Sequence, residues 1–163
     1  MKLRAIVAVM LVLGLTGCGV TTPSQSTSAV VPSARASLAA GDPCVLLPDF
    51  AAAVGREPVA SPDAYAVGPT ERCLWVVALD PSRSVGLSIG PATNHGTTID
   101  ALGNGESVDG LGDDARWWPA ARTLSVAVGD RSIQIDLQLD DAGATRDLAV
   151  ELARQALEAL GGD

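Results

Sequence analysis

The sequence predicts a single α+β domain in which an antiparallel sheet packs against an N-terminal and a C-terminal helix. Residues 124–139 carry the clearest strand signal, because apolar and polar side chains alternate on both sides of a Gly129-Asp130 turn. This alternation predicts a hairpin with one apolar and one polar face. Residues 142–160 predict a helix, since their apolar side chains form one stripe and their charged side chains lie away from it. We expect that stripe to cover the apolar face of the hairpin.

The domain begins with a helical segment at residues 42–55. Asp42 is a candidate N-cap with a proline at the first helical position, and Gly55 is a candidate C-cap. Pro48 is expected to divide the segment into a short turn and a second helix start, because a proline inside a helix costs about 3 kcal/mol.

Further strands are expected in the middle of the domain. Residues 72–79 alternate in both registers, which is typical of a strand covered on both faces for part of its length. After a turn at residues 80–83, a second strand with one apolar face runs to Gly90-Pro91. The remaining assignments are an edge strand at 57–60, a loop at 61–70 and a short helix at 97–102.

The first 17 residues have the order of a bacterial secretory signal. Two cations precede an apolar block at residues 5–15, which is shorter than the roughly 20 residues that span a bilayer. Small residues then precede Cys18, and this run resembles the bacterial lipoprotein box. The resemblance implies diacylglycerol on the Cys18 sulfur and cleavage just before it. The alternative is a cysteine that stands beside an ordinary signal cleavage site.

These features predict a protein held on the extracytoplasmic face of the cell membrane by the lipid on Cys18. Residues 18–41 are rich in Ser, Thr, Pro and Ala and predict a flexible tether, and residues 42–163 form the globular domain. The formal net charge of −8 disfavours contact with nucleic acid and with anionic headgroups. We therefore expect membrane attachment to come from the lipid, and no nucleic-acid partner.

With Cys18 modified, two cysteines remain, Cys44 and Cys73. A pair of cysteines in an exported protein predicts a disulfide, although two free core thiols are the alternative. A metal site would need more ligands than one histidine supplies, so no metal and no cofactor are expected.

The run Gly86-Leu87-Ser88-Ile89-Gly90 matches the G-x-S-x-G pattern of a hydrolase nucleophile elbow. The elbow needs a sharp strand-to-helix turn, whereas Ser88 lies inside an alternating strand and Pro91 stands where the helix would start. His95, the single histidine, follows with no acid between it and Ser88. We therefore expect Ser88 to be a strand residue on the more polar face and His95 to lie in a surface loop.

Three acids, Asp109, Asp113 and Asp114, lie in and beside residues 110–115, which fit the pattern G-x-G-x-x-A. The aspartates would repel a pyrophosphate, so the segment predicts a tight glycine turn before a strand and not a phosphate loop. The acids could gather a calcium ion, but their spacing does not match an EF-hand loop. The expectation is a solvated acidic turn.

The neighbours Trp117 and Trp118 form a possible contact surface. Adjacent strand residues face opposite sides of a sheet, so one indole can enter the core while the other is exposed. The alternative is that both are covered, one by the sheet and one by a helix or loop.

Several short elements of the sequence together resemble a known family. The run Asp42-Pro43-Cys44-Val45-Leu46-Leu47 is followed by Val54-Gly55, Cys73-Leu74-Trp75, and Gly110-Leu111-Gly112-Asp113-Asp114-Ala115 with Trp117. This combination resembles the DUF3558-type lipoproteins of actinobacteria; Pro48 departs from it where Ser or Thr would cap the first long helix. The resemblance implies a secreted or lipid-anchored α+β domain with the disulfide, and it brings no established activity or catalytic residues.

The sequence thus predicts a membrane-anchored extracytoplasmic lipoprotein whose domain binds a small ligand or an envelope protein without catalysis. The alternative is an envelope hydrolase that uses Ser88 or the acids Asp109, Asp113 and Asp114. The third interpretation is that the domain is a purely structural partner in an envelope complex.

Overall fold

The computed structural model describes residues 42–80, 83–140 and 142–161. The chain divides into two units, and all of the described residues belong to the second, Ala36–Asp163. The predicted signal peptide, the lipid on Cys18 and the whole predicted tether at residues 18–41 lie outside the described residues. Within the described residues, no helix is long and apolar enough to cross a membrane.

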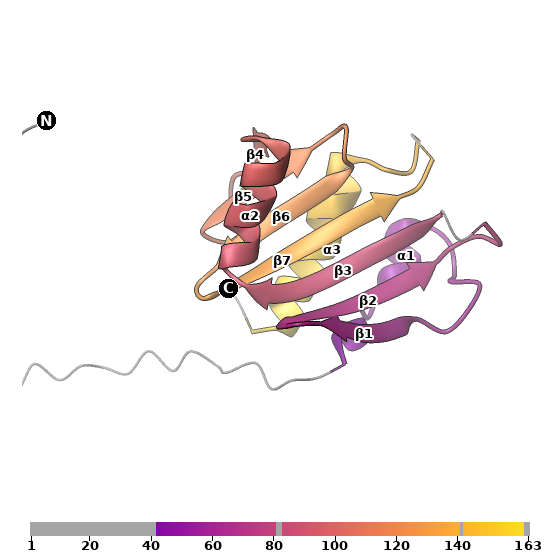
Figure 1. Ribbon diagram of the computed structural model, residues 1–163. Coiled ribbons are helices and arrows are strands. Elements are labelled where there is room, and N and C mark those ends of the chain that lie inside the picture. Colours follow the sequence, from indigo (N-terminus) through magenta and orange to yellow (C-terminus); the bar gives the residue numbers. More distant parts are fainter. Residues whose placement is uncertain (1–41, 81–82, 141, 162–163) are drawn as a thin grey trace, which may run out of the picture. The chain divides into compact units, whose positions relative to one another are not determined.

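A seven-stranded antiparallel sheet forms the centre of the domain, with the strand order β1-β2-β3-β7-β6-β5-β4 (Figure 1). The strands are β1 (Asp63–Val67), β2 (Thr70–Val76), β3 (Ser84–Pro91), β4 (Glu106–Ser107), β5 (Asp114–Trp118), β6 (Thr123–Val128) and β7 (Arg131–Gln138). The hairpin predicted around Gly129-Asp130 is β6 and β7, and the predicted fold class is confirmed.

Helices lie on both faces of the sheet (Figure 1). The N-terminal segments η1 (Pro43–Leu46) and α1 (Phe50–Val54) share one face with the long C-terminal helix α3 (Arg146–Ala159). Helix α2 (Thr93–Leu102) lies on the other face, over β6 and β7. Pro48 separates η1 from α1, as predicted, because neither segment can continue through it.

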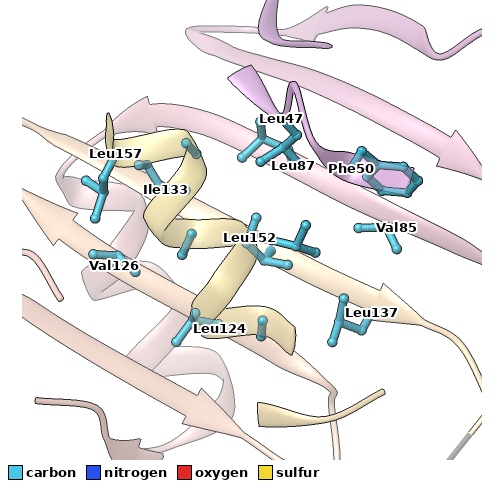
Figure 2. Packing of buried hydrophobic residues seen from close by; sticks show 14 of the residues in the cluster. Leu47, Phe50, Val85, Leu87, Leu124, Val126, Ile133, Leu137, Leu152 and Leu157 are labelled. Carbon is cyan, nitrogen blue, oxygen red and sulfur yellow. The ribbon is translucent and has the colours of Figure 1, made fainter. Parts of the chain in front are cut away.

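The main apolar core lies between the sheet and α3. Figure 2 shows Leu152 and Leu157 of α3 facing Val126 and Ile133 of the hairpin. The N-terminal segment closes the same core, where the ring of Phe50 stacks on Trp75 with 4.9 Å between centroids. The prediction that the C-terminal helix covers the apolar face of the hairpin is confirmed.

The disulfide joins Cys44 at the start of the domain to Cys73 in β2, with 5.1 Å between their Cα atoms. This confirms the predicted pairing. The bond fixes η1 against β2 and β3, close to the stacked Phe50 and Trp75.

The edge strand lies at a different place from the one predicted. Residues 61–70 were expected to form a loop, but residues 63–67 form β1, and residues 57–60 form no strand. All five side chains of β1 are exposed, so the strand has no apolar alternation to reveal it. Its backbone ladder with β2 defines it instead.

Two element boundaries also differ from prediction. Helix α2 begins at Thr93, four positions before the expected start at residue 97, since contacts made by Asn94 and His95 with the sheet hold its first turn. The strand expected at residues 72–79 is β2, which ends at Val76.

Candidate functional site

The face of the sheet beneath α2 is polar across most of its width. Paired positions on five neighbouring strands, β2, β3, β7, β6 and β5, place one row of side chains on this face: Arg72, Ser88, Gln134, Ser125 and Arg116. Since α2 lies over β6 and β7, it covers one part of the row and leaves the part on β2 and β3 beside it (Figure 1). The prediction that Ser88 is a strand residue on the more polar face is confirmed.

An open cavity of about 270 Å³, which we call the polar groove, lies beside α2 on this face. Its lining residues come from β1, β2, β3, β7 and α2: Val67, Thr70, Arg72, Ser88, Asn94, Thr97, Thr98, Ser132 and Gln134. All but Val67 have a polar side chain, and Arg72 is the one charged residue among them. The polar groove is therefore lined by hydroxyls and amides with one cation.

Hydrogen bonds hold the walls of the polar groove in place. Asn94 of α2 donates to the Thr70 hydroxyl of β2 at 2.9 Å, and the Thr98 hydroxyl lies 3.2 Å from the Gln134 side-chain oxygen that accepts from it. Gly90 allows this approach, because a Cβ at that position would collide with the side chains of Asn94 and Thr70. Gly90, the second glycine of the apparent hydrolase motif, thus makes room for α2.

Among the described residues that line the groove, Arg72 has a buried polar atom without a hydrogen-bond partner. Its Nε atom is buried and has no hydrogen-bond partner among the residues that the structure describes. Buried donors of this kind are nearly always hydrogen-bonded in folded proteins. The guanidinium is therefore the feature of the groove that most needs an explanation.

A second polar cluster lies under α2. His95 bridges two strands: its Nδ1 is 2.9 Å from the Ser125 hydroxyl on β6, and its Nε2 is 3.1 Å from a carboxylate oxygen of Asp114 on β5. The other oxygen of Asp114 accepts from Arg116 Nε at 2.9 Å. The hydrogen bond with His95 is the main influence that lowers the pKa of the Asp114 carboxyl; burial opposes it, and Arg116 adds to it.

The Ser125, His95 and Asp114 side chains have the composition of a catalytic triad. A nucleophile must reach its substrate, but Ser125 is 1% exposed and His95 is 6% exposed. The cluster instead joins α2 to two strands. The expectation that His95 lies in a surface loop was wrong, because its ring is inserted between α2 and the sheet.

The predicted site residues are not brought together. Both ring nitrogens of His95 are hydrogen-bonded, one to Ser125 and the other to Asp114, so His95 is not placed to act as a base for Ser88. Asp113 accepts from the Gly129 amide at 2.6 Å, whereas Asp109 is exposed. Within the described part of the chain, no group of three His, Cys, Asp or Glu side chains could hold a metal ion.

The two tryptophans do not form an exposed contact surface. Trp117 is 4% exposed and Trp118 is 5% exposed, and the Trp118 indole donates to the Gly103 carbonyl at 2.9 Å. The alternative that both are covered is the one the structure supports: Trp117 lies in the apolar core, and the segment after α2 covers Trp118.

The glycine segment at residues 110–112 is a tight turn, as predicted. Gly110 and Gly112 both have positive φ angles, and Leu111 between them is buried. A Cβ on Gly112 would collide with the Ala127 carbonyl and the Val126 side chain, so the turn packs directly against β6.

Sequence reasoning missed the residues that the sheet assembles. Ser125 and Asp114 lie 30 and 19 positions from His95, and no local motif links them. The available signals were weak: Ser125 takes a polar position in an alternating strand, and His95 is the single histidine. Arg72 carried no signal beyond its place at the start of a predicted strand.

Comparison with protein-family models, with curated proteins and with solved structures found no match to the chain.

Proposed function

We propose that the protein is a lipid-anchored extracytoplasmic domain that binds a small polar ligand in the polar groove, without catalysis. The observation that carries the proposal is the buried, unpartnered Arg72 Nε in a groove lined by hydroxyls and amides. Ligand sites are concave and contain a few convergent polar groups that fix the ligand's orientation. The signal-like leader, the run before Cys18 and the disulfide support a location outside the cytoplasm.

The anchor is tested by metabolic labelling with radioactive palmitate in the native host. The wild-type chain is expected to incorporate label and to fractionate with membranes, and Cys18→Ala is expected to lose both properties. Cys73→Ser serves as a matched control, since it removes a different cysteine and should keep the label. Unchanged lipid incorporation in Cys18→Ala would refute the anchor.

The ligand site is tested by NMR on the complete lipid-modified chain in neutral detergent micelles. Acetamide, glycerol, acetate and inorganic phosphate serve as probes, and at least one should shift the backbone amide signals of Thr70, Ser88 and Ser132. These three residues line the groove from β2, β3 and β7. Shifts confined to other parts of the domain would contradict the groove as the binding site.

A fluorophosphonate probe, which labels activated serines, distinguishes the hydrolase alternative from the proposed binding domain. We expect no labelling, because His95 is bonded to Ser125 and Asp114 and not to Ser88, and the Ser125 hydroxyl is enclosed. Labelling that disappears in Ser88→Ala would favour the hydrolase over the binding domain.

A further inference from the structure

Arg72 gives the polar groove a positive charge in a chain whose formal net charge is −8. The other polar groups that line the groove are neutral hydroxyls and amides. Within the described part of the chain Arg72 makes no ion pair. The groove therefore has an uncompensated cation and no acid along its lining.

The unpartnered Nε of Arg72 specifies what kind of group is missing. A buried N–H of a guanidinium loses its hydrogen bond to water and gains nothing in return unless an acceptor reaches it. Guanidinium groups present a planar fork of N–H donors that matches the oxygens of carboxylates and phosphates. An oxyanion in the groove would pair with the guanidinium charge of Arg72, and it would also satisfy the buried Nε donor once the atoms that cover this nitrogen move aside.

None of the described residues that line the groove accepts a hydrogen bond from Arg72 Nε. Asn94 and Thr98 are already hydrogen-bonded to Thr70 and Gln134. The carboxylate of Asp136, further along the same face, accepts from Thr123 and Gln134 and does not line the groove. Ser88, paired directly with Arg72, adds a hydroxyl to the same part of the groove.

The size of the groove limits the ligand. Its volume of about 270 Å³ is below the range of roughly 300–1,000 Å³ that holds drug-sized ligands. A single cation and this volume fit a small organic acid or a small phosphate compound better than a polyanion.

From these observations we propose that the ligand of the polar groove carries a carboxylate or phosphate group, and that Arg72 binds this group. The inference rests on the proposed function, and it assigns to that site a ligand class and an anchoring residue.

The test follows the side-chain Nε–Hε signal of Arg72 by NMR in the complete lipid-modified chain, at constant ionic strength. Acetate and inorganic phosphate are the charged probes, and acetamide is the uncharged match of acetate. Both oxyanions are expected to shift the Arg72 signal in a saturable way, and acetamide is not. The oxyanion that binds with the higher affinity identifies the natural group as a carboxylate or a phosphate. An equal response to acetamide would overturn the assignment of an anionic ligand.

Three variants test the anchoring role. Arg72→Gln should weaken oxyanion binding by roughly 10- to 100-fold, the effect of one charge-assisted hydrogen bond. Arg72→Lys keeps the charge but lacks the Nε donor, and should weaken binding about tenfold. Arg56→Gln removes the same charge from an exposed position outside the groove and should bind as the wild type does. Wild-type affinity in both Arg72 variants would overturn the proposal.

The outcomes also separate this inference from the proposed function. Groove amide shifts produced by acetamide or glycerol but not by the oxyanions would contradict the ligand class while leaving a binding groove. No response in the groove to any of the four probes would contradict the groove as a binding site, and with it both proposals.

Discussion

Gly110 and Gly112 share a left-handed backbone but differ in their surroundings. Their φ angles are +71° and +63°. A Cβ on Gly110 would meet open space, whereas a Cβ on Gly112 would lie 2.7 Å from the Val126 side chain and even closer to the Ala127 carbonyl. The two positions therefore separate the cost of the backbone conformation from the cost of a collision.

We predict that Gly112→Ala lowers the free energy of unfolding by about 2–4 kcal/mol, and that Gly110→Ala lowers it by about 1–2 kcal/mol. The first substitution combines strain with a collision, and the second has strain alone. Urea unfolding measures both values. An equal loss of unfolding free energy in the two variants would show that β6 shifts to accommodate the added methyl group.

Asp114 has a pKa below its ordinary value of 3.8, first because of its hydrogen bond with His95 and then because of Arg116. A carboxyl whose pKa is lower in the folded than in the unfolded chain stabilises the fold above its unfolded pKa. That contribution disappears as the pH falls through the folded pKa. Asp114 therefore contributes to stability at neutral pH and not in strong acid.

We predict that Asp114→Asn is less stable than the wild type at neutral pH, and that the difference shrinks as the pH falls below about 4. Comparing the two proteins at each pH removes the effect of the other acids. Exposed Asp109→Asn is the control and should give a much smaller pH-dependent difference. A difference that stays constant from pH 7 to pH 3 would contradict a role for the Asp114 charge.

Helix α2 is attached to the sheet mainly through polar contacts. His95 lies between Ser125 and Asp114, Asn94 reaches Thr70, and Thr98 reaches Gln134. Helix α3, by contrast, buries an apolar stripe that includes Leu152 and Ala153. The two helices therefore differ in the kind of interaction that holds them, and α2 has less apolar burial to resist opening.

We predict that His95→Ala lowers the free energy of unfolding by about 1–3 kcal/mol, because it leaves the buried Ser125 hydroxyl without its partner. Hydrogen exchange should speed up in α2 and remain nearly unchanged in α3. Thr97→Ala changes an exposed position of the same helix and is the control. Uniform acceleration over both helices would mean that α2 opens only when the whole domain unfolds.

At the scale of the whole molecule, the covalent link between Cys44 and Cys73 encloses a loop with a sequence separation of 29. Closing a loop of that length restricts the unfolded chain by about 3–4 kcal/mol. We predict that the double variant Cys44→Ser, Cys73→Ser loses about this much stability. Reductant should bring the wild type to the level of the double variant and leave the variant unchanged. A large effect of reductant on the double variant would point to another cause.

The fold was predictable where one face of an element is apolar. The alternation around Gly129-Asp130 and the stripe of α3 place the central hairpin and its covering helix correctly. Strand β1 has no buried side chain, and its formation depends on the backbone ladder with β2, which no pattern within the strand reveals. The first turn of α2 likewise depends on contacts with residues distant in sequence.

The candidate site was not predictable in the same way. Arg72, Ser88 and Gln134 become neighbours through the register of three strands, and the first and last of them are 62 positions apart in the sequence. The motif that drew attention to Ser88 has a geometric role instead, since Gly90 leaves room for Asn94. Local patterns thus identify elements, whereas cross-strand register determines which side chains share a face.

The position of the disulfide has a mechanical consequence. A pull on the chain before Asp42 passes through Cys44 into β2 at Cys73, because a covalent bond is stiffer than the hydrogen bonds of η1. The segment between the two cysteines, which includes α1, β1 and Arg72, is bypassed by that force. Under tension from its N-terminal end, the domain would therefore carry the load along β2 from Cys73 onward, while the chain between the two cysteines, with Arg72 at its end, carries little of it.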